Sequence, residues 1–99
     1  MGLPVARIAD LDSWHDCGQP LRLTTSKGVF VNGRPASLLG DPNTTHIING
    51  KDPCSKPHIG NVVVGSPVVY INGRPVARIS SAVSLCGLVV TGSESVYVA

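Results

Sequence analysis

Three residues with metal-binding side chains stand at one fixed distance from a proline in this 99-residue chain. Each follows its proline by eleven positions, and the three residues are His15, His46 and Cys86. Imidazole nitrogens and thiolate sulfurs are ligands that zinc prefers in proteins. Because one spacing recurs three times, we interpret the three residues as one set of metal ligands.

The proline spacing is part of a longer internal repeat. A glycine stands two positions before each proline, and a small apolar residue follows it directly. The aligned residues are Gly2, Pro4 and Val5; Gly33, Pro35 and Ala36; and Gly73, Pro75 and Val76. Five positions before the three ligands the copies carry Asp10, Asp41 and Ser81. The chain is therefore predicted to contain three related units.

The register of the repeat also connects the end of the chain to its beginning. Phe30 and Tyr70 each stand two positions before the Asn-Gly step of their copies. Tyr97 holds the same place in the final segment "GSESVYVA", where the N-terminal copy would follow next. The last strand is therefore expected to lie beside the first.

Short β-strands are predicted around the two Asn-Gly steps, at 32–33 and 72–73. Asn-Gly between runs of β-forming residues is the strongest short hairpin signal. The segments 60–70 and 87–99 suggest two more strand pairs with Gly-Ser turns, and 80–87 suggests at most one helical turn. With irregular loops expected at 10–27 and 40–60, the fold class is all-β.

Three units of this size cannot bury their own apolar faces, so they are expected to share one core. A symmetric arrangement would then bring His15, His46 and Cys86 together near the axis. Tetrahedral zinc requires a fourth ligand. His58 in the longest loop is the candidate, and Cys54 is its competitor. Three histidines and one cysteine would fill a structural zinc site and leave no position for a catalytic water.

Other polar residues near these positions have two interpretations each. Asp10 and Asp41 are either partners that orient the imidazoles or residues that stabilise turns. Trp14 either shields the metal or points outward. Cys17 and Cys54 are expected to be free thiols. The arginines expected to brace turns or strand ends are Arg7, Arg34 and Arg78.

Composition excludes several classes of protein. One domain over 1–99 is the most that this length allows, and 42% hydrophobic residues with 11 Gly and 8 Pro indicate a turn-rich folded chain. The net charge of +2 is too small, and the basic residues too scattered, to indicate nucleic-acid binding. No signal peptide and no apolar run of about 18–20 residues is visible.

These motifs resemble those of PAAR-repeat proteins, which cap the spike of bacterial type VI secretion systems and related contractile phage tails. The stretches that carry the resemblance are "GLPVAR" at 2–7, "NGRPAS" at 32–37 and "NGRPVAR" at 72–78. No copy reads Pro-Ala-Ala-Arg itself, and two read Pro-Val-Ala-Arg. The copies lie near 2–15, 26–46 and 65–86, with a closing strand at 92–99.

The resemblance implies a cone-shaped monomer whose flat base sits on a trimeric β-helical spike protein of the valine-glycine-repeat type, one copy per trimer. It also implies one structural zinc at the tip, held by His15, His46, His58 and Cys86. The Gly-x-Pro hairpins near 2–7, 32–37 and 72–78 are expected to form the base, with Ala36 and Val76 as contacts there if they point outward. Such a protein is not an enzyme, and it pierces a membrane without spanning it.

The resemblance further implies a place and a set of partners. The protein would reside in the bacterial cytoplasm before firing and then be delivered into a target cell or the medium, or it would form the tail tip of a phage. Effector proteins would be recruited non-covalently, because no further domain is seen at either end.

Two other function classes are weaker. A small zinc-dependent hydrolase could use His15, His46 and an aspartate around an open metal position. It lacks a visible general base, and the four candidate ligands would close the site. A zinc-ribbon module for nucleic acid would need paired Cys-x-x-Cys steps, which the sequence lacks.

Overall fold

The computed structural model describes residues 2–14, 19–25, 28–44, 59–84 and 87–99. Within these ranges the chain forms short antiparallel strand pairs and no helix, so the predicted all-β class is confirmed. The strands are β1 (Leu3–Pro4), β2 (Phe30–Val31), β3 (Arg34–Pro35), β4 (Tyr70–Ile71), β5 (Arg74–Pro75), β6 (Ala82–Val83), β7 (Gly87–Leu88) and β8 (Tyr97–Val98).

Three of the strand pairs share one register. In each pair an aromatic residue lies opposite a proline, and the pairs are Tyr97 with Pro4, Phe30 with Pro35 and Tyr70 with Pro75. β2–β3 and β4–β5 are hairpins, whereas β1 and β8 come from opposite ends of the chain. The pairing predicted from the position of Tyr97 is therefore present.

The two hairpins turn through their Asn-Gly steps. Asn32 and Gly33 have φ angles of 54° and 79°, and Asn72 and Gly73 have 51° and 80°. A two-residue turn of type I′ requires positive φ at both central residues, which asparagine and glycine tolerate best. The local sequence thus dictates these two hairpins.

A closed cycle of backbone hydrogen bonds joins the segments that follow β1, β3 and β5. The N–H of Ala6 donates to the carbonyl of Ala77 (2.9 Å), and the N–H of Ala77 to the carbonyl of Ser37 (2.8 Å). The N–H of Ser37 returns to the carbonyl of Ala6 (2.9 Å). Each segment therefore bonds to both of the others.

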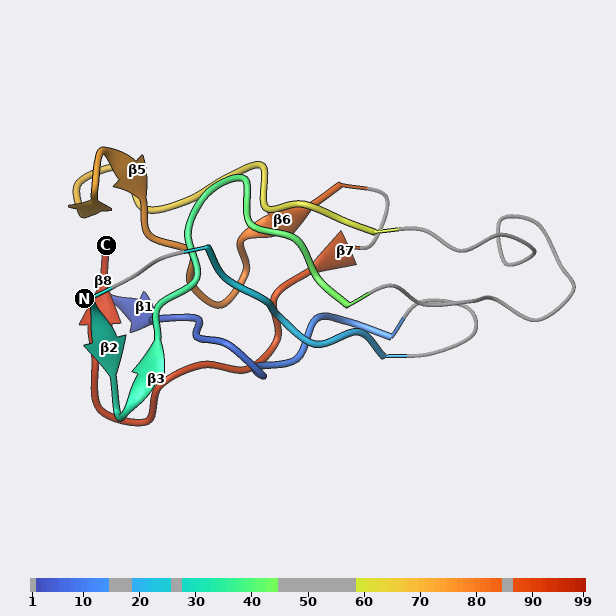
Figure 1. Ribbon diagram of the computed structural model, residues 1–99, viewed down its shortest axis with the longest axis horizontal. Coiled ribbons are helices and arrows are strands. Elements are labelled where there is room, and N and C mark those ends of the chain that lie inside the picture. Colours follow the sequence, from blue (N-terminus) through green and yellow to red (C-terminus); the bar gives the residue numbers. More distant parts are fainter. Residues whose placement is uncertain (1, 15–18, 26–27, 45–58, 85–86) are drawn as a thin grey trace, which may run out of the picture.

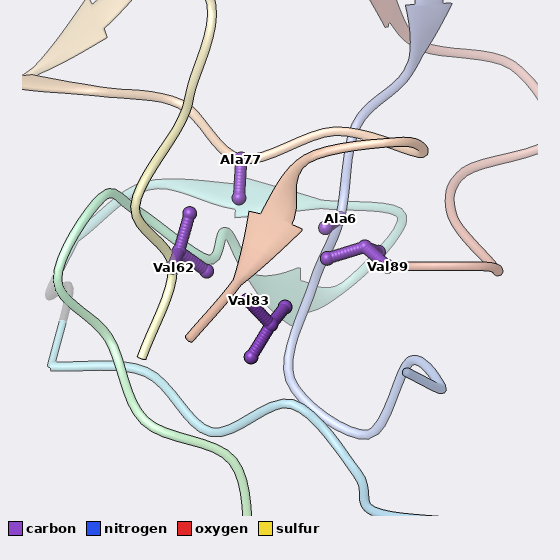
Figure 2. Packing of buried hydrophobic residues seen from close by; sticks show 5 residues of the cluster. All are labelled: Ala6, Val62, Ala77, Val83 and Val89. Atoms are coloured by element: carbon purple, nitrogen blue, oxygen red, sulfur yellow. The ribbon is translucent and has the colours of Figure 1, made fainter. Parts of the chain in front are cut away.

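The core surrounds this cycle in two clusters of buried apolar side chains. The first contains Ala6, Val62, Ala77, Val83 and Val89, whose side chains point toward one another in Figure 2. The second contains Val5, Val31, Ala36, Leu38 and Val76. Ala36 and Val76 are thus fully buried and do not point outward on a base, so they cannot serve as contacts there.

The strands gather toward one end of the molecule. β1, β2, β3, β5 and β8 lie together at one end of the long axis in Figure 1, with β6 and β7 farther along it. β4 belongs to the same group because it pairs with β5. We call this region, formed by β1–β5 and β8, the strand-pair end.

The two strand pairs expected around Gly-Ser turns are not formed. Gly65 and Gly92 do not turn the chain back on itself; they permit close approach of another segment. A Cβ atom on Gly65 would lie 2.7 Å from the Cβ of Pro75, and one on Gly92 would lie 2.8 Å from the carbonyl oxygen of Val5. The strands on either side of each glycine therefore pair with different segments.

The single helical turn that the sequence allows within 80–87 is not formed where the structure describes this stretch. Ala82–Val83 forms β6 and pairs with β7, and Val62 bridges Val83 from the other side. Partners on both sides outweigh the weak local helical preference of this stretch.

Candidate functional site

The predicted zinc ligands His15, His46, His58 and Cys86 lie outside the described residues, as do Cys17 and Cys54. Among the residues that are described, no group of three or more His, Cys, Asp or Glu side chains could hold a metal ion. All histidines and cysteines of the chain fall outside these ranges, so the zinc site stays a prediction.

The chain segments that lead to three of these ligands are bonded alike. Ser13, Thr44 and Ser84 each stand two positions before a predicted ligand. Their N–H groups donate to the carbonyls of Leu88 (2.7 Å), Leu21 (2.8 Å) and Asn61 (2.9 Å), respectively. Those three acceptors hold one place in the repeat, so the three segments leave the described part of the chain from corresponding positions.

Trp14 directly precedes His15 and is 74% exposed. The Trp14 side chain therefore points outward, which is the second of its two interpretations.

A buried polar cluster lies just before these segments, and the sequence analysis missed it. Arg22, Asp12 and Asn43 are fully buried. The Nε of Arg22 lies 2.9 Å from Oδ1 of Asp12, and the side-chain amide of Asn43 donates to Oδ2 of Asp12 (2.9 Å). Asn43 in turn accepts from the N–H of Gly60 (2.8 Å).

One residue of the cluster, Arg22, stands where the corresponding positions are apolar. Arg22 holds the place of Val62 and Val89, since the N–H groups of all three donate to the carbonyl of an equivalent residue. Its Nη2 atom is buried without a hydrogen-bond partner among the described residues. Alignment of the three copies could have revealed this cluster, because an arginine aligned with two valines marks a break in the repeat.

Asp10 organises the turn that begins at Arg7. Its carboxylate accepts hydrogen bonds from the backbone N–H (2.8 Å) and Nε (2.9 Å) of Arg7 and from the hydroxyl of Thr91 (2.9 Å). Burial by itself would raise the pKa of Asp10, but these bonds outweigh it and hold the pKa below its ordinary value. The turn interpretation of Asp10 is confirmed.

Asp41 has the corresponding role in the second copy. It accepts from the N–H of Leu38 (2.8 Å), from the hydroxyls of Thr24 (2.9 Å) and Thr25 (2.6 Å), and from Arg74 (3.3 Å). Burial again opposes these bonds, and the net effect lowers the pKa of Asp41. The bonds of both aspartates thus brace turns.

A polar hollow of about 460 Å³ opens beside the first of these turns. Its lining residues are Arg7, Asn32, Arg34, Glu94 and Ser95. Arg7 donates to Asn32 (3.1 Å), Asn32 donates to Ser95 (2.9 Å), and Arg34 lies 3.4 Å from Asp10. These contacts confirm that Arg7 and Arg34 brace a turn and a strand end.

The strand-pair end exposes three large aromatic side chains in one register. Phe30, Tyr70 and Tyr97 are 61%, 55% and 54% exposed, respectively. Each lies opposite the proline of its strand pair. Exposed aromatic rings at three corresponding places are suited to contact with another protein.

No family model matches the chain, and no curated protein is significantly similar to it. Within the described ranges, no helix is long and apolar enough to cross a lipid bilayer.

Proposed function

We propose that this chain is a structural tip protein that caps a trimeric β-helical spike of the valine-glycine-repeat type. The observation that carries the proposal is the set of three exposed aromatic residues, Phe30, Tyr70 and Tyr97, which occupy one register at the strand-pair end. These residues would contact the end of the spike, in the manner of a PAAR-repeat protein.

A single chain can fit a threefold trimer evenly only if it imitates threefold symmetry. The shared register of the strand pairs supports a domain of three pseudo-threefold hairpin repeats. The closed hydrogen-bond cycle through Ala6, Ala77 and Ser37 supports it as well. Three equivalent surfaces would then meet the three chains of the spike.

One zinc ion would close the tip, held by His15, His46, His58 and Cys86. The donor set is chemically suited to a structural zinc, and corresponding backbone positions lead to three of its members. We expect the protein purified without chelators to contain one zinc per chain. We also expect chelation to lower its melting temperature, because zinc binds only the folded arrangement.

The cap has a mechanical and not a catalytic role in this proposal. The protein would sharpen the spike, pass through a membrane with it and carry non-covalently bound effectors. Contraction of a secretion system or a phage-like tail would drive it from the bacterial cytoplasm.

Charge substitutions test which surface meets the spike. Phe30→Asp, Tyr70→Asp and Tyr97→Asp, combined in one variant, place charges on the apolar surface. We expect the variant to lose capture by an immobilised spike trimer from the same organism, while its zinc content stays at one per chain.

Matched controls lie on other exposed apolar residues. Val63 and Val90 are 53% and 40% exposed and bond to the segments around β6 and Leu11, away from the strand-pair end. Val63→Asp with Val90→Asp should leave capture unchanged. Loss of capture in this control, together with normal capture by the aromatic variant, would place the contact surface elsewhere and refute the proposal.

A further inference from the structure

Three turns of the chain share one hydrogen-bond pattern. In each turn the side chain of the fourth residue accepts from the N–H of the first. These bonds run from Arg7 to Asp10 (2.8 Å), from Leu38 to Asp41 (2.8 Å) and from Arg78 to Ser81 (3.0 Å). The N–H of each fourth residue also donates back to the carbonyl of the first, at 2.9–3.0 Å. The turns are therefore directly comparable.

The first and third turns both begin with an arginine, but the two arginines are bonded differently. Arg7 is buried, and its guanidinium donates to Asp10 and to Asn32. The ion pairs of the described residues involve Arg7, Arg22, Arg34 and Arg74, and not Arg78. The Nε of Arg78 is buried and has no hydrogen-bond partner in the described part of the chain.

The sequence explains why Arg78 is left without acceptors. Three groups around Arg7 have a less polar or shorter counterpart in the third turn. Ser81 stands for Asp10, Val64 for Thr91, and Leu3 for Arg34. The arginine is kept, while the carboxylate of the fourth residue and the hydroxyl that neighbours it are absent.

We propose that Arg78 binds a carboxylate from a protein partner, an aspartate or glutamate side chain, as Arg7 binds the carboxylate of Asp10 within the chain. A buried guanidinium donor without an acceptor is costly, so a ligand that supplies one gains that energy. Arg78 is partly exposed, whereas Arg7 is buried.

The surroundings favour a protein over a free ion. Leu3 and Val64, the counterparts of Arg34 and Thr91, are both exposed apolar side chains. A site that binds a carboxylate beside exposed apolar side chains suits an acidic side chain that projects from the surface of another protein. Only the third turn combines an arginine with exposed apolar neighbours, so this chain would bind a single copy of the partner, on the side where that turn lies. The inference depends on the turns alone and not on the capping role.

Nuclear magnetic resonance tests the site directly. The Nε–Hε signal of Arg78, assigned by its loss in Arg78→Lys, is followed while sodium acetate replaces sodium chloride at constant ionic strength. We expect a saturable shift of this signal, with the Nε–Hε signal of Arg7 unmoved because Asp10 already occupies that place.

Two variants exchange the chemistry of the first and third turns. Ser81→Asp should abolish the acetate response of Arg78 and raise the melting temperature by about 4–8 °C, the effect expected for one satisfied buried donor in a domain of this size. Asp10→Ser should create a new acetate response at Arg7. Should either variant fail to fold, the titration of the unaltered protein still decides.

An Arg78 signal that does not respond to acetate would overturn the proposal. So would an acetate response that persists unchanged in Ser81→Asp, since the ligand would then lie elsewhere. A parallel titration with inorganic phosphate separates the sources: a much tighter response to phosphate than to acetate would overturn the assignment to a carboxylate.

Discussion

Arg22 shows how one residue can break a pattern that its neighbours keep. It places a guanidinium where the corresponding positions carry Val62 and Val89, and Asp12 and Asn43 surround it. A buried ion pair of this kind adds little net stability, because removing two charges from water is costly. Removing only one partner leaves the other charge buried and alone.

Substituting the ion pair is therefore expected to be strongly non-additive. Arg22→Val should lower the free energy of unfolding by about 3–5 kcal/mol. Arg22→Val combined with Asp12→Val, which imitates Val62 at the place of Arg22 and Val83 at the place of Asp12, should recover a large part of that loss. Urea unfolding of the single and double variants measures the coupling. Strictly additive losses would show that the two side chains act independently.

Asp10 gives the chain a defined pH dependence. Its pKa is lower in the folded than in the unfolded state, where an aspartate titrates near about 3.9. Its contribution to stability is therefore complete above that value and is lost as the pH falls through the lower, folded-state pKa.

Comparison with Asp10→Asn isolates this contribution. At pH 7 the variant should be less stable by about 1.5–3 kcal/mol, the usual value of hydrogen bonds to a charged group. The difference from the unaltered protein should shrink as the pH falls below about 4. Thermal unfolding of both proteins from pH 2 to 7 measures it, and a constant difference would contradict the role given to the carboxylate.

At the scale of elements, the sequence predicts hairpins well and packing contacts poorly. Asn-Gly steps at 32–33 and 72–73 determine their own turns, because few other residues accept two positive φ angles. Gly65 and Gly92 gave a misleading turn signal, because their role is to let another segment of the chain approach closely, and that segment is not adjacent in sequence. Local chemistry can predict the first kind of glycine and not the second.

Gly65→Ala tests that interpretation. The added Cβ would meet the Cβ of Pro75 at 2.7 Å and the carbonyl oxygen of Val76 at 3.0 Å, so the backbone must shift. We expect a loss of about 1–3 kcal/mol in unfolding free energy, as for other overpacked sites. Val63→Ala, at an exposed position nearby, should change stability by about 0.5 kcal/mol or less. Equal effects would mean that Gly65 is an ordinary loop residue.

For the whole molecule, the repeat register predicts the pairing of the two chain ends, and β1 with β8 shows that pairing. The positions of Pro4 and Tyr97 carried enough information for this result. The buried cluster around Arg22 and the unpaired guanidinium of Arg78 could not be predicted in the same way. Both depend on which residues interrupt the repeat and on what then surrounds them in space.

A circular permutant tests the closed arrangement. Joining position 99 directly to Gly2, with Ala99→Asn, would give β8 and β1 the same two-residue Asn-Gly turn as the hairpins. Opening the chain between Asn72 and Gly73 then separates β4 from β5 without removing a residue of either. We expect the permutant to fold with a cooperative thermal transition. A chain that stays unfolded would show that the order of the units matters more than their contacts.

The stoichiometry of the complex with the spike tests the central proposal most directly. Native mass spectrometry of the protein mixed with the trimeric spike protein should show one copy of this chain, with one zinc ion, on each trimer. That ratio follows from a single chain that presents Phe30, Tyr70 and Tyr97 as three equivalent contacts. Three copies per trimer, or no complex at all, would contradict it.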